Sequence, residues 1–183
     1  MGKNRGKQFE SHIQEAFEKV PGVSVDRLHD QTTGYLGASN ICDFIVYKKP
    51  YEYYIECKSV HGNTLSIHSI PKPDKKGVLH GFYGNISDTQ WEGLLEKSKI
   101  PGVVAGIMCW WIDLDETWFI PIQILEEARN LMHAKSINAK YPYRQGDWFC
   151  VRGYKKRVFF EYYMDDLLRE LEDGKEKRHT KRS

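Results

Sequence analysis

The chain has 183 residues, of which 40% are hydrophobic and 28% are charged, and its formal net charge is +2 at pH 7. These fractions are typical of a soluble globular protein, and the length allows one domain with a substantial core but not two large ones. No run of about 18 apolar residues occurs, which excludes a membrane-spanning helix, and no apolar signal segment follows the basic N-terminus. We therefore expect a cytoplasmic protein that has no contact with a membrane.

The first predicted element is a helix from about residue 4 to residue 20. Its apolar residues recur at helical spacing, and they are Phe9, Ile13, Ala16, Phe17 and Val20. Pro21-Gly22 then ends the helix. Glu10 lies on the same side as Ile13 and Phe17, so we expect it to border the buried stripe. A short strand at 23–28 and a loop at 31–40, rich in Thr, Gly and Ser, follow.

Two apolar, strand-like runs come next, at about 42–48 and 52–60, with a hairpin turn between them. They carry three charges that buried strands normally avoid, namely Asp43, Glu56 and Lys58. Glu56 and Lys58 are two residues apart, so in a strand they project from the same face. There they can converge with Asp43 to hold Mg²⁺ and a water against a phosphate, which predicts the core of a metal-dependent nuclease. The alternative is an exposed salt bridge between Glu56 and Lys58 on a half-solvated sheet.

Residues 63–85 contain two prolines and several lysines, and we expect a long, basic, mobile loop there. Ser87 or Asp88 is the expected N-cap of a helix that contains Gln90. The run 103–111 is nearly all apolar, which predicts a strand covered on both faces, and 117–122 is expected to pair with it.

The C-terminal part is expected to begin with a helix at about 123–134. One or two aromatic-rich strands should lie between 148 and 163, and a last helical turn or two at 164–171. Residues 173–183 form a basic tail that we expect to be disordered. The four cysteines lie singly in apolar runs and are expected to be reduced core residues; they are Cys42, Cys57, Cys109 and Cys150.

Positive charge gathers in four clusters although the net charge is small. The clusters are Lys3/Arg5/Lys7, Lys72/Lys75/Lys76, Arg152/Lys155/Lys156/Arg157 and Lys175/Lys177/Arg178/Lys181/Arg182. Any one of them alone is explained by a solvated surface or a frayed tail. Four clusters around an acidic centre suit a polyanionic substrate, and they favour DNA or RNA as the partner.

The order of helix, loop, Asp strand, Glu-x-Lys strand and Gln helix resembles the PD-(D/E)xK nuclease superfamily. It resembles most the RecU-type Holliday junction resolvases of Gram-positive bacteria and their phages. The matching residues are Asn4-Arg5-Gly6-Lys7-x-Phe9-Glu10, Gln31-Thr32-Thr33-Gly34-Tyr35, Asp43-Phe44, Glu56-Cys57-Lys58, Gln90 and Lys135-Ser136-Ile137. The resemblance implies a restriction-endonuclease-like α/β fold, with a mixed central sheet flanked by helices, in a single nuclease domain over residues 1–172.

One departure concerns the stalk that the bacterial enzymes insert before the Thr-Thr segment and that enters the junction centre. The path from Val20 to Thr32 is too short to hold such an insertion. The basic segment 63–85 is a candidate replacement, and weaker junction selectivity is the alternative.

The residue chemistry and the resemblance together suggest roles. Asp43 and Glu56 are the expected carboxylate ligands of Mg²⁺, for which Mn²⁺ can substitute, and the resemblance adds the Cys57 backbone carbonyl. By the same reasoning Glu10 anchors a metal water or a second ion, and Lys58 positions the attacking water or neutralises developing charge. Gln90 orients Glu56, Lys58 or the water, unless it is simply an exposed helix residue. The expected DNA contacts are Arg5, Lys7, Thr32, Thr33, Ser39, Lys72, Lys75 and Lys76, although the hydroxyl residues among them also suit a turn.

We therefore expect a Mg²⁺-dependent endodeoxyribonuclease that cleaves branched double-stranded DNA, specifically a Holliday junction resolvase in recombination, repair or phage DNA processing. The alternatives are a restriction-like or end-processing nuclease of the same superfamily and a non-catalytic DNA-binding factor with this fold. Two symmetric nicks need two sites that share the symmetry of the junction, so a homodimer is expected. The aromatic-rich segments Trp110-Trp111 and 158–163 are the candidates for contact with the partner.

Overall fold

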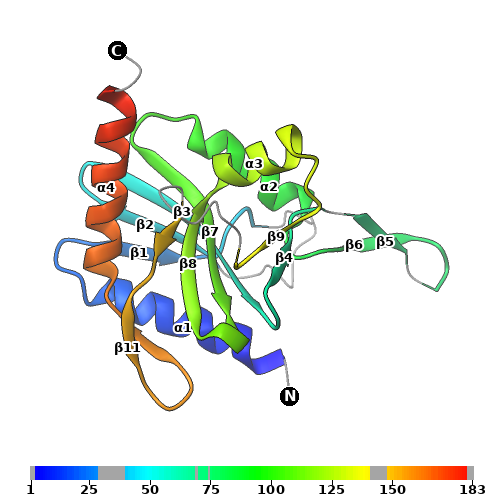
Figure 1. Cartoon of the computed structure of the whole chain (residues 1–183), viewed down its shortest axis with the longest axis horizontal. Helices are drawn as coiled ribbons and strands as arrows, with labels where there is room; N and C mark the ends of the chain where they lie inside the picture. Colours follow the sequence, from blue (N-terminus) through cyan, green and yellow to red (C-terminus); the bar gives the residue numbers. More distant parts are fainter. Residues whose placement is uncertain (1–2, 29–39, 69, 74, 141–147, 181–183) are drawn as a thin grey trace.

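The computed structural model describes residues 3–28, 40–68, 70–73, 75–140 and 148–180. Its centre is a six-stranded sheet in the order β1-β2-β3-β7-β8-β10, with helices on both faces (Figure 1). The helices and strands are α1 Lys3–Glu18, β1 Ser24–Arg27, β2 Phe44–Lys48, β3 Tyr51–Val60, β4 Thr64–Ser66, β5 Ile70–Pro73, β6 Leu79–Tyr83, α2 Asp88–Ser98, β7 Val103–Trp111, η1 Ile112–Leu114, β8 Glu116–Pro121, α3 Ile122–Leu131, β9 Ser136–Asn138, β10 Phe149–Cys150, β11 Gly153–Lys155, β12 Phe160–Tyr162 and α4 Met164–Thr180.

The sheet is mixed because one of its connections is a crossover. β2 and β3 form an antiparallel hairpin, and α2 then carries the chain over the sheet so that β7 runs parallel to β3, from Glu52 beside Val103 to Val60 beside Trp111. β8 returns antiparallel to β7. β7 is buried along its whole length, as its apolar sequence predicts. The expectation of a mixed α/β fold with a helix-flanked central sheet is confirmed.

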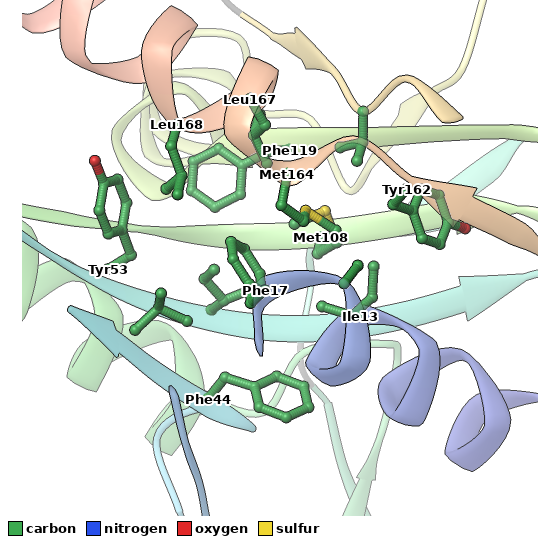
Figure 2. Close-up of a cluster of buried hydrophobic side chains, with 14 of the residues drawn as sticks. Ile13, Phe17, Phe44, Tyr53, Met108, Phe119, Tyr162, Met164, Leu167 and Leu168 are labelled. Atoms are coloured by element: carbon green, nitrogen blue, oxygen red, sulfur yellow. The ribbon is translucent and has the colours of Figure 1, made fainter. Parts of the chain in front are cut away.

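One face of the sheet is covered by α1 and α4. Phe9, Ile13 and Phe17 of α1 are completely buried against the sheet, and Leu167 and Leu168 of α4 join the same cluster. Figure 2 shows Ile13, Phe17, Leu167 and Leu168 in this cluster together with Phe44, Tyr53 and Met108. Aromatic and aliphatic side chains of this size each contribute about 1.5–3 kcal/mol when they are fully buried. The apolar residues at helical spacing in α1 therefore form one side of this cluster.

The opposite face is covered by α2 and α3. Trp91 and Leu94 of α2 pack with Leu125 of α3 in a second cluster, which includes Ile107 and Trp111 of the sheet. Ser87 is the N-cap of α2, as predicted, and its hydroxyl accepts the backbone N–H of Gln90 at 3.2 Å. This cap sets where α2 begins, and it matters for the site described below.

The C-terminal segment differs from its prediction. α4 continues to Thr180, so residues 173–180 are helical where a disordered tail was expected. Leu167, Leu168 and Leu171 anchor the helix on the core, and propagation beyond this anchored part costs little because nucleation has already occurred. The helix also begins with Asp165 and Asp166, which suit the positive end of its dipole.

The segment 63–85 is not a simple loop. β4 pairs with β9, and β5 and β6 form an antiparallel hairpin that projects from the body of the molecule (Figure 1). Leu65, Ile67 and Ile86 are buried at the base of the projection and tie it to the second cluster. The prolines and lysines of this segment suggested a loop, because its composition gave little weight to these three apolar residues.

Two further expectations were wrong. Trp110 and Trp111 are buried inside the chain, where Phe9 and Phe159 cover Trp110 and where Trp148 stacks on Trp111, so neither can contact a partner. Cys150 is exposed because it lies on β10, the edge strand of the sheet, whereas the other three cysteines are buried and free. Within the described residues, no helix is both long enough and apolar enough to cross a membrane.

Candidate active site at the fork between two strands

The site lies where β2 and β3 separate. Their pairing runs from Lys48 opposite Tyr51 to Phe44 opposite Ile55, and the backbone N–H of Asp43 makes a last bond to the Ile55 carbonyl at 3.1 Å. Beyond Ile55, β3 continues to Val60 with β7 on its other edge. The two strands therefore form a fork, and Asp43 lies at its base.

The side chain of Asp43 replaces the missing strand partner. Its Oδ2 accepts the backbone N–H of Cys57 at 2.7 Å, a donor that β2 no longer reaches. Buried backbone donors are costly when they are left unpaired, so this bond stabilises the fork as well as the carboxylate. The Asp43 carbonyl also accepts the N–H of Leu28 at 2.8 Å, which holds the residue from the β1 side.

Strand alternation directs Glu56 away from α1 and toward α2. Ile55 and Cys57 enter the cluster under α1, so Glu56 and Lys58 occupy the other face. Glu56 is only 3% exposed. Its Oε1 accepts two hydrogen bonds of 2.5 Å, one from Lys58 Nζ and one from Gln90 Nε2. The predicted convergence of Asp43, Glu56, Lys58 and Gln90 is present in the structure.

Gln90 is oriented by the cap of its own helix. It is the third residue after Ser87, and its Oε1 accepts the Ser87 backbone N–H at 3.1 Å in a capping box. Because Oε1 is engaged there, the Nε2 amino group is the end that faces Glu56. Lys58 Nζ also lies 3.4 Å from Gln90 Oε1. Gln90 is therefore a fixed donor to the buried carboxylate, and the reading of it as a simple exposed helix residue is wrong.

Burial controls the ionisation of this cluster. Desolvation raises the pKa of Glu56 to about 8, the Lys58 ammonium opposes this shift, and the charges of Asp43 and Glu10 reinforce it. Burial likewise raises the pKa of the Cys57 thiol, and the pKa of Cys42 rises to about 12 for the same main reason. The two thiols therefore stay protonated at neutral pH, which leaves carboxylates as the ligands that the fork offers.

A divalent cation suits these carboxylates. Mg²⁺ binds proteins through one or two carboxylates and takes its other ligands from water and phosphate, which matches the pair Asp43 and Glu56. A cation beside Glu56 would also favour the ionised form that burial disfavours. Among the described residues, no group of three His, Cys, Asp or Glu side chains could hold a metal ion, so the fork offers a pair and not a complete cage. The Cys57 carbonyl stays a predicted third ligand.

Glu10 is paired with an arginine in the structure. It lies on α1, and its Oε2 accepts a hydrogen bond from Arg27 Nη2 at 2.5 Å. Its charge still contributes to the raised pKa of Glu56. The position of Arg27 on β1, which packs beside α1, explains the pairing, and no local pattern in residues 24–27 predicts it. A role for Glu10 with a water or a second ion stays a prediction.

The predicted DNA contacts lie on separate elements. Arg5 and Lys7 are in the first turns of α1, where Arg5 is half-buried and Lys7 is exposed. Lys75 and Lys76 are exposed in the turn of the β5–β6 hairpin, and Lys72 is on β5. Thr32, Thr33 and Ser39 lie outside the described residues. The β5–β6 hairpin, which carries these three lysines, projects from the body of the molecule (Figure 1).

The similarity of this chain to known proteins is found among solved structures. No protein-family model and no curated protein sequence matches the chain. Among solved structures, the chain is similar to Hjc from Archaeoglobus fulgidus, a Holliday junction resolvase from an archaeal hyperthermophile. The two are 16% identical, the match covers 65% of this chain and 78% of that chain, and the TM-score is 0.43.

Proposed function

We propose that the chain is a Mg²⁺-dependent endodeoxyribonuclease of the PD-(D/E)xK type that cleaves branched DNA as a Holliday junction resolvase. The observation that carries the proposal is the fork, at which Asp43 and Glu56 from neighbouring strands meet Lys58 and Gln90. Two carboxylates, one ammonium and one amide donor in a buried setting are the groups that phosphodiester hydrolysis needs.

The chemistry is divided among these residues. Asp43 and Glu56 would hold the divalent cation, which supplies positive charge at the scissile phosphate when it is bound. Lys58 is more exposed than Glu56, at 17% against 4% of the side chain, so its ammonium is the group that reaches toward solvent. It orients the attacking water or stabilises the charge that develops on the phosphate. Gln90 keeps Glu56 in place throughout.

The burial of Glu56 argues against a non-catalytic DNA-binding role. A carboxylate that is 3% exposed and whose pKa is raised to about 8 destabilises the fold at neutral pH. A binding factor gains nothing from such a residue, because DNA is bound by surface cations. Functional sites are where strongly perturbed groups of this kind concentrate.

We further propose that the enzyme acts as a homodimer. One domain offers one fork, whereas a junction needs two symmetric nicks, and a twofold dimer matches that symmetry. Tyr154, Val158 and Tyr163 are exposed apolar residues on or beside the β11–β12 hairpin, and they are the candidates for contact with a partner. The measurement is light scattering with and without junction DNA, and a monomer in both conditions that still cuts both strands in one binding event would refute the dimer.

The test of the proposed activity is cleavage of a four-way junction, a linear duplex, a flap and a single strand, each with Mg²⁺ or with EDTA. Asp43→Asn and Glu56→Gln should abolish cutting and leave DNA binding largely intact. Glu52→Gln is the matched control, because it removes the same charge from the same strand at the end remote from the fork. Full activity in EDTA, or in either fork variant, would refute the site. Preference for the duplex, the flap or the single strand would identify a restriction-like or end-processing nuclease instead.

A further inference from the structure

A second polar arrangement lies just beyond the end of the catalytic strand. β3 ends at Val60, and Asp113 of η1 accepts hydrogen bonds from the next two residues of the chain, His61 and Gly62. Its Oδ1 lies 2.9 Å from His61 Nδ1, and its Oδ2 lies 2.5 Å from the backbone nitrogen of Gly62. Gly62 has a φ of 72°, which explains the glycine in this tight turn. One carboxylate thus fixes both the turn and the imidazole ring.

The bonding to Asp113 determines which side of His61 faces outward. The pKa of Asp113 is lowered, first by the Gly62 N–H, then by His61 and further by the nearby Arg5 guanidinium. An ionised carboxylate can only accept, so His61 Nδ1 is the donor. Nε2 is at the opposite side of the ring, and 62% of the His61 side chain is exposed. Nε2 is therefore accessible, and in the imidazolium form it donates to an anion.

This arrangement lies in line with the fork. His61 follows Lys58 by three residues and lies just past the end of β3, so the backbones of the two residues are separated by up to about 10 Å. The first turns of α1 reach the same end of β3, because a Cβ built on Gly6 would lie 3.6 Å from Ser59 Oγ. Arg5 precedes Gly6 and is close enough to act on Asp113. The Arg5 guanidinium and the His61 ring thus lie just past the end of the strand that carries Glu56 and Lys58.

We propose that His61, held by Asp113 and flanked by Arg5, contacts a backbone phosphate of the DNA strand that is cut. About 10 Å corresponds to about three steps of 3.4 Å along a duplex axis, so the phosphate lies within about three nucleotides of the cleaved bond. Such a contact sets the register of the strand in the fork and carries no sequence preference. The inference rests on the proposed nuclease function.

The competing explanation is that Asp113 and His61 only close the turn. His61→Asn distinguishes turn closure from phosphate contact, because an asparagine amide can still donate to Asp113 but has no donor in the position of Nε2. His61→Ala removes both the closure and the contact. His133→Asn is the matched control, since His133 is an exposed histidine with a φ of 51°, a conformation that asparagine tolerates.

The experiment is the affinity of the wild type and the three variants for a four-way junction in EDTA, measured by anisotropy between 50 and 200 mM salt. Each phosphate contact contributes about 0.9 to the slope of log K against log salt. When His61 is in the imidazolium form, we expect H61N and H61A to lose this amount, so that the wild-type advantage shrinks about 3.5-fold over that range. H133N should match the wild type, and H61N should melt near the wild-type temperature.

A methylphosphonate scan then locates the phosphate. Neutral linkages placed one, two and three nucleotides from the cleaved bond should weaken the wild type at one position, and H61N should be insensitive there. If H61N shows the same salt slope and the same methylphosphonate scan as the wild type, the inference is overturned while the nuclease assignment stands. A wild-type protein that binds no DNA at 50 mM salt would refute the nuclease proposal as well.

Discussion

Replacing the buried acid of the fork is expected to stabilise the metal-free protein. Glu56→Gln keeps the shape of the side chain and an oxygen that can accept the bonds from Lys58 and Gln90. It removes a carboxyl whose pKa is raised by burial from 4.5 to about 8 in the folded chain. Since the folded pKa lies above the unfolded one, ionisation costs no stability below pH 4.5, and the cost grows until pH 8.

The size of the effect follows from this pKa difference. Each pH unit within the window changes the free energy of unfolding by about 1.4 kcal/mol, so the advantage of E56Q over the wild type should grow by about 2–3 kcal/mol between pH 5 and pH 7. For a chain of this length that corresponds to roughly 5–10 °C in Tm. Part of the absolute gain is offset, because Lys58 loses its charged partner.

The assay is urea and thermal unfolding of both proteins in EDTA from pH 5 to pH 8.5. Glu52→Gln shows how much of the change follows from the loss of one negative charge on β3. Addition of Mg²⁺ should stabilise the wild type more than E56Q, which reverses the order of the two curves. Stability curves of wild type and E56Q that run parallel across the whole pH range would refute the buried-acid reasoning.

Three further outcomes are expected. Lys58→Ala should lower turnover and leave metal affinity nearly unchanged, as measured by single-turnover cleavage and by Mg²⁺ titration calorimetry, and a large loss of Mg²⁺ affinity would contradict the assignment. Ser87→Ala should cost about 1 kcal/mol of stability with cleavage retained, whereas Gln90→Ala should lose both stability and cleavage, since of these two residues only Gln90 contacts Glu56. Equal cleavage by the two variants would remove Gln90 from the site. At limiting Mg²⁺ the cleavage rate should rise up to about pH 8, because the cation binds ionised Glu56. Saturating Mg²⁺ should shift this rise to lower pH, and a rate that is flat from pH 6 to pH 8 would contradict it.

Much of the site could be predicted from the sequence because strand alternation is a strict geometric rule. Asp43, Glu56 and Lys58 lie inside apolar runs, where a charge needs a partner, and the hairpin between β2 and β3 brings them together. The site role of Gln90 was suggested by the family resemblance, and the N-cap at Ser87 fixes the start of the helix that carries it.

Contacts between distant segments were not readable in the same way. Arg27 pairs with Glu10 and Asp113 pairs with His61 because of how α1 and η1 pack on the sheet, which no local pattern encodes. The β5–β6 hairpin was hidden because a two-stranded projection needs few apolar residues, and composition alone cannot distinguish it from a loop.

The two ends of the β5–β6 hairpin are held together by contacts at its base that do not depend on its length. Asn85 Oδ1 accepts the backbone N–H of Ser66 at 2.7 Å, and a Cβ at Gly84 would collide with the His68 carbonyl at 2.4 Å, so the two ends of the projection are held side by side. The next residues are Ile86, which is buried, and Ser87, which caps α2, so the helix begins at a fixed position. The hairpin can therefore differ in length or charge without displacing the Gln90 amide that holds Glu56, so under the proposed function its DNA contacts can change independently of the candidate active site.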